Sequence, residues 1–343
     1  MIKFAIVLGF VAAAAASPAI VRSRDEIEAF RHFLESTKTD DGTNYLARLK
    51  ASPLANPEEN SGKFEGDIIL DDFIMKAMLW EYAMGRNAYT WPDTKWPNNT
   101  VIWEFGEDEF DDEQKEAIKD GIADIEKNTC IRFQYRDAVA YNGSFVRLTG
   151  KPGGCYAHVG YSATRGVHTL NLARNTPGVG CFRHGTIVHE WLHIIGFFHM
   201  QSTYDRDNYV KIVHENLIPG TEHNFAIYGP DQVSNLGVEY DYESCLHYGP
   251  FAFSVNGEKT IVEHEGTMGQ RVFVTEKDWL RANRHYKCPE ISQSDVQVKV
   301  LEATGKTYYF ISLHSSTVIN IMSLYRTKCY QFHRRELKNI PKL

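Results

Sequence analysis

The sequence lacks any long apolar run after its first residues. Lys3 precedes an apolar stretch over residues 4–16, which ends in small residues before Ser17. This is the pattern of a secretory signal peptide, here residues 1–16. The stretch is too short to span a membrane, and no later one reaches the roughly 20 apolar residues that a span requires. We therefore expect a secreted, extracellular protein without a membrane anchor.

Blocks of basic residues are missing as well. The chain carries 37 Lys and Arg against 44 Asp and Glu, and the net charge of −7 is spread along it. A surface that tracks phosphates is not expected, so we expect no nucleic-acid partner. Cysteine is sparse, but six cysteines in a secreted chain predict disulfides, whose pairing the spacing leaves open. Sequons at Asn98 and Asn142 predict N-glycosylation in the same compartment.

Strand and helix patterns alternate through the middle of the chain. The alternation in VIWEF, residues 101–105, predicts a half-buried strand. Asp111 offers a helix N-cap with Gln114 three residues later, and the helix is expected to end near Cys130. Strands with helices between them predict a mixed α/β sheet. Further elements are expected as strands at 131–135 and 167–172 and as a helix at 184–195.

The segment HEWLHIIGFFH combines three histidines with a glutamate. Residues four apart share one face of a helix, so His189 and His193 direct their imidazoles at one point, with Glu190 beside them. Gly196 can adopt the left-handed conformation that ends a helix, which lets the chain present His199 as a third ligand. Neutral imidazoles in tetrahedral geometry suit zinc, and a catalytic site keeps one position for water. The pattern predicts one catalytic Zn²⁺ per chain.

The ion and Glu190 together predict a hydrolase. Zinc lowers the pKa of its bound water from 15.7 to about 7 and polarises a substrate carbonyl. Because Glu190 lies next to the ligands on the same helix, it is placed to take the proton of that water. It can then return the proton to the leaving amine, acting as general base and then as general acid.

These residues resemble those of a known family. HExxHxxGxxH resembles the metzincin signature, and the following QSTYDRDNYV looks specifically like the astacin family of zinc metalloendopeptidases. The resemblance runs from VIWEF through NTCIRF, GGCYAHVGY and SCLHYGPFAFS to HYKCPE. It implies an α/β (α+β) fold, in which residues 87–288 form a two-subdomain catalytic domain with a mixed, mostly parallel sheet and an active-site cleft. It also implies an extended substrate on an edge strand near residues 155–160, held by main-chain hydrogen bonds.

The resemblance also assigns a tyrosine and most of the cysteines. SCLHY resembles the turn beneath the zinc, and Tyr248 matches the tyrosine that can coordinate zinc and stabilise the tetrahedral intermediate. An oxyanion donor of this kind commonly contributes about 2.7–4 kcal/mol. The implied disulfides are Cys130–Cys288 and Cys155–Cys181. The resemblance leaves Cys245 and Cys329 unassigned, and these two can be free or bonded.

Residues 17–86 are interpreted as a propeptide. FEGD at 64–67 looks like the FxGD motif with which astacin propeptides place an aspartate on the catalytic zinc. The resemblance therefore implies that Asp67 takes the position of the water. Arg86 offers a cleavage site for an activating trypsin-like protease. At the other end, residues 289–343 contain no recognisable module and are expected to form a tail of unknown structure.

Two residues depart from the astacin pattern close to the zinc. Leu246 replaces a methionine that forms an apolar floor, an exchange that usually costs less than about 1.5 kcal/mol. Met200 replaces the glutamate that binds the buried ammonium of the mature N-terminus. Since methionine cannot pair with an ammonium, our hypothesis is that the mature N-terminus near Asn87 stays solvated or finds another acceptor. The charged residues 205–207 are interpreted as a structural ion-pair network.

The sequence thus predicts a secreted zinc endopeptidase, made as a zymogen, that cleaves proteins or peptides. The alternative is a catalytically impaired relative that keeps zinc and acts as a peptide-binding module, which Met200 and Leu246 favour. The retention of every catalytic group argues against it. GQR at 269–271 resembles the segment after the turn in astacins, and Arg271 is a candidate for binding an acidic residue after the scissile bond.

Overall fold

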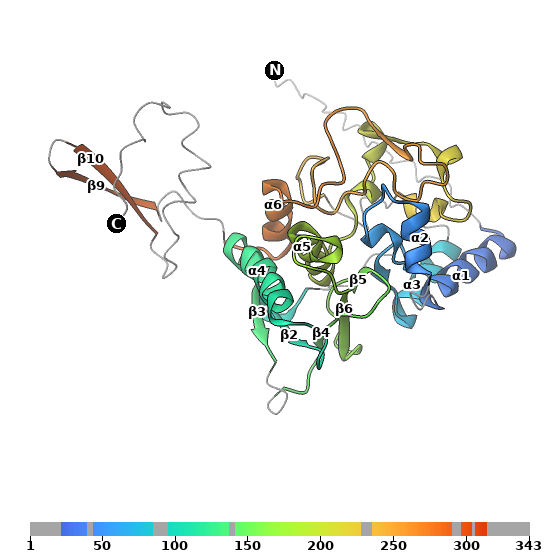
Figure 1. The fold of residues 1–343 in the computed structure, drawn as a ribbon, viewed down its shortest axis with the longest axis horizontal. Helices are drawn as coiled ribbons and strands as arrows, with labels where there is room; N and C mark the ends of the chain where they lie inside the picture. The colour runs from blue at the N-terminus through green and yellow to red at the C-terminus, as the bar shows by residue number, and fades with distance from the viewer. Residues whose placement is uncertain are drawn as a thin grey trace, which may run out of the picture. The chain divides into compact units, whose positions relative to one another are not determined.

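Figure 1 shows the computed structural model of the chain. Residues 1–288 form one compact unit and residues 289–343 a second. The expected signal peptide, the cleavage site at Arg86 and Cys329 lie outside the described residues. No helix in the described part of the chain is long and apolar enough to cross a bilayer. The structure describes residues 22–39, 44–84, 95–136, 141–227, 235–289, 296–303 and 306–313.

A six-stranded sheet is the main element of the larger unit. Each pair of neighbouring strands is parallel, except that β5 and β6 are antiparallel. The mixed, mostly parallel sheet that the sequence predicts is confirmed. Across the sheet, the strands are β1 (Ile68–Ile69), β5 (Cys155–His158), β6 (Val167–Leu172), β4 (Phe145–Thr149), β2 (Thr100–Phe105) and β3 (Arg132–Tyr135).

Two helices pack against each other beside the sheet (Figure 1). Helix α4 (Asp112–Asn128) begins at a capping box, in which the side chains of Asp111 and Gln114 each accept from the other's amide, at 2.8 and 3.2 Å. Helix α5 (His184–Ile194) contacts α4 on one side and strands β5 and β6 on the other. The zinc-motif residues on α5 are therefore held by the main apolar core. The apolar residues that α4 buries are Ile118, Ile122 and Ile125.

The expected propeptide folds onto the catalytic domain. Its helices are α1 (Arg24–Thr39), α2 (Tyr45–Ala51) and α3 (Asp72–Ala83). Its strand β1 pairs in parallel with β5, so this segment adds an edge strand to the domain's sheet. Apolar residues of the segment, including Leu34, Phe64 and Ile68, form a cluster with Val159 and Phe198 of the domain.

Most of the described residues between α5 and α6 (Glu276–His285) lie outside helices and strands. Strands β7 (Val210–Ile212) and β8 (Ile261–Glu263) form a small antiparallel sheet there. Met200 is 3% exposed and belongs to an apolar cluster that also contains Tyr248. Single 3-10 turns occur at Glu58–Asn60, Pro97–Asn99, Gly180–Phe182, Met200–Ser202, Arg206–Asn208, His214–Asn216 and Glu222–Phe225.

The smaller unit contains a β-hairpin. Strand β9 (Val296–Ala303) pairs antiparallel with β10 (Lys306–Leu313). The sequence led us to expect only a tail of unknown structure here, although β9 begins with the alternating stretch VQVKVL. The hairpin gives this part of the chain regular structure of its own.

Two disulfides link segments that are distant in the sequence. The bonded pairs are the two that the astacin resemblance implies, Cys130–Cys288 and Cys155–Cys181. Cys245 is a free thiol with no exposed surface. The second disulfide attaches β5 to the 3-10 turn that precedes α5, and so fixes the edge strand beside the helix of the zinc motif.

Candidate metal centre and active site

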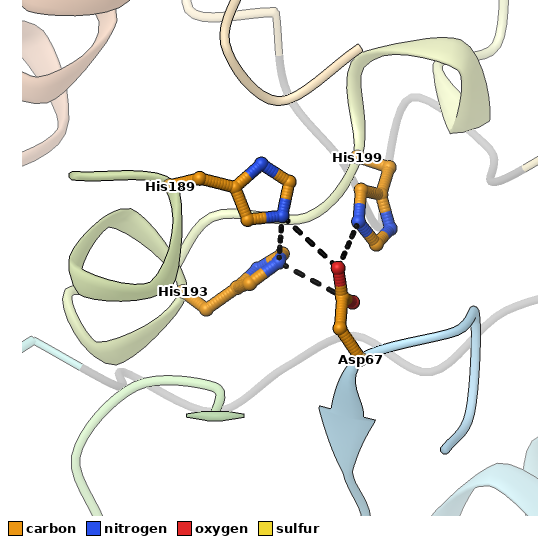
Figure 2. Close-up of side chains that lie close together, drawn as sticks. All are labelled: Asp67, His189, His193 and His199. Atoms are coloured by element: carbon orange, nitrogen blue, oxygen red, sulfur yellow. Dashed lines mark hydrogen bonds and ion pairs between the residues drawn. The ribbon is translucent and has the colours of Figure 1, made fainter. Parts of the chain in front are cut away.

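Three imidazoles converge at the C-terminal end of α5. His189 and His193 lie one turn apart on this helix. Gly196 follows with a φ of +107°, a left-handed conformation that lets the chain reverse and bring His199 to the same point. Figure 2 shows the three rings directed at the carboxylate of Asp67, which comes from the segment just before β1. Potential ligand atoms of the four residues all lie within 4.8 Å of one another, and all four residues are buried.

Hydrogen bonds to the far side of each ring fix its tautomer. His189 Nδ1 lies 2.7 Å from the carbonyl oxygen of Cys245, and His193 Nδ1 lies 2.7 Å from that of Phe197. A carbonyl only accepts, so both Nδ1 atoms carry the proton. Each Nε2 therefore presents a lone pair to the common centre, as metal-binding histidines do.

The third histidine is oriented by a carboxylate of the N-terminal segment. His199 Nδ1 lies 2.9 Å from Glu65 Oε2, and its Nε2 lies 3.2 Å from Asp67 Oδ2. Burial opposes a charge on His199, but the two carboxylates outweigh it and raise its pKa to about 9. The electrostatic environment therefore favours a positive charge at this point.

The donor set fits a divalent cation such as zinc. His189 Nε2 and His193 Nε2 are 3.0 Å apart, and Asp67 Oδ2 is 3.0 Å from the former. Two lone pairs and a carboxylate at these distances repel one another unless a cation lies between them. Burial lowers the pKa of His189 to about 4, so this imidazole is in the neutral form that binds zinc at pH 7. Three imidazoles and one carboxylate are ligands that zinc accepts in tetrahedral geometry.

Glu190 lies on α5 next to the first histidine and is completely buried. Neither of its carboxylate oxygens has a hydrogen-bond partner among the residues that the structure describes. Burial and the negative charges of Asp67 and Glu58 raise its pKa above the usual value. A buried carboxylate without a partner is costly, and such groups are commonly retained for catalysis.

Tyr248 lies beside the third histidine. Its ring centroid lies 4.6 Å from that of His199, and its hydroxyl donates to the carbonyl oxygen of Glu65 at 2.6 Å. The turn that carries it is attached to α6, because Ser244 Oγ donates to Asp278 at 2.6 Å. Leu246 is buried in the main apolar core beneath the site, where the resemblance implies an apolar floor.

Arg271, the candidate substrate-binding residue, is buried and paired with a residue of the N-terminal segment. Its guanidinium has no exposed surface and forms an ion pair with Glu58. It also donates to the carbonyl oxygen of His247 at 3.0 Å, next to Tyr248. The adjacent Glu59 accepts from the amide of Gly249 at 2.6 Å. The roles of Glu58, Glu59 and Glu65 were not anticipated from the sequence. Glu65 occupies the variable position within FEGD, and Glu58 and Glu59 lie a few residues before that motif.

The two sequons lie on the surface. Asn98 is exposed in a 3-10 turn, and Asn142 is exposed shortly before β4. Both side chains are therefore accessible to a modifying enzyme, and their glycosylation remains a prediction.

Comparison with known proteins identifies the family. Residues 88–287 match the family model described as Astacin (Peptidase family M12A). The chain is 35% identical over 231 residues to the zinc metalloproteinase nas-4 of Caenorhabditis elegans, covering 66% of this chain and 70% of that protein. It is 36% identical over 242 residues to seminal metalloprotease 1 of Drosophila melanogaster, covering 68% and 90%.

A solved structure agrees with this match. High choriolytic enzyme 1, a hatching enzyme zinc-protease of the medaka Oryzias latipes, is 32% identical and superposes with a TM-score of 0.50. The superposition covers 58% of this chain and 95% of that enzyme. With the family model, two relatives and the histidine cluster in agreement, the chain belongs to the astacin family of zinc metalloendopeptidases.

Proposed function

We propose that the chain is the zymogen of a secreted endopeptidase that holds one zinc ion through His189, His193 and His199 and cleaves protein substrates with Glu190 and Tyr248. The observation that carries the proposal is the convergence of three imidazole Nε2 atoms beside a buried carboxylate that has no hydrogen-bond partner among the described residues. Two disulfides fit the extracellular location. The expected signal peptide, residues 1–16, is part of the same proposal.

The protein groups have separate tasks in hydrolysis. When bound, zinc supplies a Lewis acid that polarises the scissile carbonyl and acidifies water. Glu190 takes a proton from the attacking water and delivers it to the amide nitrogen as the C–N bond breaks, so the carboxylate is regenerated. Tyr248 donates its phenolic proton in a hydrogen bond to the oxyanion of the intermediate. Its ring lies beside His199, which supports this role.

Latency follows from three contacts of the FEGD segment. Asp67 binds at the point where the three histidines meet. The hydroxyl of Tyr248 donates a hydrogen bond to the carbonyl oxygen of Glu65. The side-chain carboxylate of Glu65 pairs with His199 Nδ1. The segment therefore blocks the metal position and the oxyanion donor at once. Cleavage at Arg86 by a trypsin-like protease would release it.

The substrate is proposed to bind as an extended strand on β5. In the zymogen β1 pairs with this strand, which supports β5 as an edge that accepts a peptide. Glu58 of the propeptide pairs with Arg271, which supports a preference for substrates with an acidic residue after the scissile bond. On this view the propeptide fills the acid-binding position with its own glutamate.

The test is an activity assay on the secreted protein after processing at Arg86. A quenched peptide and a denatured protein are incubated with the enzyme, with and without a chelator, and zinc content is measured in parallel. Glu190→Gln keeps the size of the side chain, and we expect it to lower kcat by about 100- to 10,000-fold with zinc retained. The control is Glu113→Gln, an exposed position on α4.

Two outcomes would contradict the proposal. A Glu190→Gln variant as active as the wild type would exclude the assigned general base. Stoichiometric zinc without cleavage of either substrate would instead favour the peptide-binding module.

A further inference from the structure

The segment after the third histidine runs beside the turn that carries Tyr248. One link between the two is a backbone hydrogen bond, from Met200 N to the carbonyl oxygen of Leu246 at 3.0 Å. The second link is not between two backbone groups, because Tyr248 N donates to the side-chain oxygen Oε1 of Gln201 over 3.1 Å. The backbone position of Tyr248 therefore depends on a side chain.

Gln201 is itself rigidly held. It has no exposed surface and lies in the 3-10 turn that begins directly after His199. Its carbonyl oxygen accepts from Arg206 Nη1 at 3.2 Å, and Arg206 is buried and paired with Asp207 at 2.9 Å. The expected ion-pair network at 205–207 thus supports the backbone of Gln201.

The orientation of the Gln201 amide is determined by the turn. A backbone N–H only donates, so the oxygen of the amide must face Tyr248 N. Its Nε2 has no hydrogen-bond partner among the described residues. The side chain therefore makes one polar contact in this set, and that contact is with Tyr248.

The carbonyl of Tyr248 is held on the opposite side. His247 Nδ1 lies 2.8 Å from this oxygen, and His247 Nε2 lies 2.6 Å from the hydroxyl of Tyr240. Both polar groups of the Tyr248 backbone are thus fixed by side chains. The phenol, in contrast, donates to the carbonyl oxygen of Glu65 in the N-terminal segment, so on the proposed function it needs a new partner once that segment is released.

We propose that Gln201 is a positioning residue that fixes the backbone of Tyr248 relative to His199. Since Gln201 is two positions from His199, this hydrogen bond sets the separation between the third imidazole and the phenol. The phenol then reaches the oxyanion without rearrangement of the turn. The inference rests on the proposed role of Tyr248 as oxyanion donor.

The test compares Gln201→Met with Ser202→Ala in the processed, zinc-loaded enzyme. Methionine keeps the length of the side chain and removes the acceptor. Ser202 is buried next to Gln201, and its hydroxyl has no partner among the described residues, so alanine there controls for general perturbation. We expect Gln201→Met to lower kcat by about 10- to 100-fold, because small misplacements of catalytic groups are costly. KM and zinc content should change less than about twofold, and Ser202→Ala should resemble the wild type.

A double-mutant cycle with Tyr248→Phe separates positioning from a structural role. If Gln201 acts through the phenol, Gln201→Met should lower kcat less than about twofold when residue 248 is already phenylalanine. An equal loss in both backgrounds, or loss of zinc from Gln201→Met, would overturn the inference. If methionine prevents folding, Gln201→Ser, which is too short to reach the amide, is measured in the same cycle. A Tyr248→Phe variant with full kcat would overturn the proposed function instead, so the two failures are distinguishable.

Discussion

If residues 17–86 act as the proposed propeptide, the buried ion pair between Glu58 and Arg271 should determine how tightly this segment inhibits the enzyme. Both side chains have no exposed surface. Burial raises the pKa of Glu58, but the Arg271 guanidinium outweighs it and holds the pKa below its usual value. Glu58→Gln removes the charge and leaves Arg271 buried without an anion. Removing one partner of a buried pair typically costs about 3–5 kcal/mol. Glutamine keeps one acceptor oxygen, so we expect about 3 kcal/mol, or roughly 100-fold weaker inhibition.

Glu59 is the matched control, because it is an adjacent buried glutamate in a different environment. Burial and then the charge of Glu58 raise its pKa to about 7. Its carboxylate accepts from the amides of Gly249 and Asn56 at 2.6 and 2.9 Å, and glutamine can keep one of these contacts. We expect Glu59→Gln to weaken inhibition by less than about tenfold at pH 6.

The raised pKa of Glu59 also gives a pH dependence of definite sign. In the free propeptide the carboxyl ionises near its ordinary pKa of 4.5, whereas in the complex it keeps its proton to about pH 7. Inhibition is therefore tightest below pH 4.5 and weakens as pH rises from 4.5 to about 7, by on the order of 100-fold. Glu59→Gln should remove this component and flatten the profile relative to the wild type.

The assay adds the cleaved propeptide, residues 17–86, to the mature enzyme with a neutral quenched peptide as substrate. Inhibition constants are measured for the wild type, Glu58→Gln and Glu59→Gln from pH 5.5 to 8. An Arg271→Met enzyme completes the comparison: without the guanidinium, Glu58 is a buried carboxylate with no paired cation, so the Glu58→Gln propeptide should inhibit this enzyme at least as tightly as the wild-type propeptide does. The reasoning is refuted if Glu58→Gln inhibits as tightly as the wild type, or if Glu59→Gln is the weaker of the two.

Two further predictions concern the metal position and the apolar cluster beside it. Asp67→Ala removes a charged hydrogen bond that contributes roughly 1.5–3 kcal/mol. The unprocessed variant should therefore cleave a quenched peptide about 10- to 100-fold faster than the wild-type zymogen. If the two are equally inactive, Asp67 is not needed for latency. Met200→Glu buries an unpaired carboxylate at a position that is 3% exposed, so we expect about 3 kcal/mol lower stability in both zymogen and processed enzyme by thermal unfolding. Recovery of stability after cleavage at Arg86 would contradict this expectation, because it would show that the mature N-terminus reaches residue 200 once a carboxylate is present there.

The parts of the fold that could be predicted from the sequence depend on short-range signals. The capping box needs only Asp111 and Gln114, which are three positions apart, and α4 begins directly after Asp111 as the sequence predicts. The alternation in VIWEF needs only the period of a strand, and β2 ends at Phe105 as predicted. The helical spacing of His189 and His193 likewise fixes two donors on one face of α5.

The unpredicted contacts join residues that are far apart in the sequence. Glu58 and Arg271 are separated by 213 positions, and Glu65 and His199 by 134. Glu58 has no local pattern that distinguishes it from a solvated charge, and Glu65 occupies the position of the FxGD motif that accepts any residue. Their burial accompanies the pairing of β1 with β5, which holds the N-terminal segment against the domain.

Met200 departs from the family pattern without breaking the link between the third histidine and the turn that carries Tyr248. Its side chain packs in an apolar cluster with Tyr248 and Phe225, so it contributes packing where a glutamate would contribute charge. Its backbone N–H donates a hydrogen bond to the carbonyl oxygen of Leu246, and this contact does not depend on the side chain at residue 200. The link between the third histidine and the turn therefore survives the exchange. Because the next link belongs to Gln201, we expect substitution there to change catalysis more than the natural exchange at Met200 does.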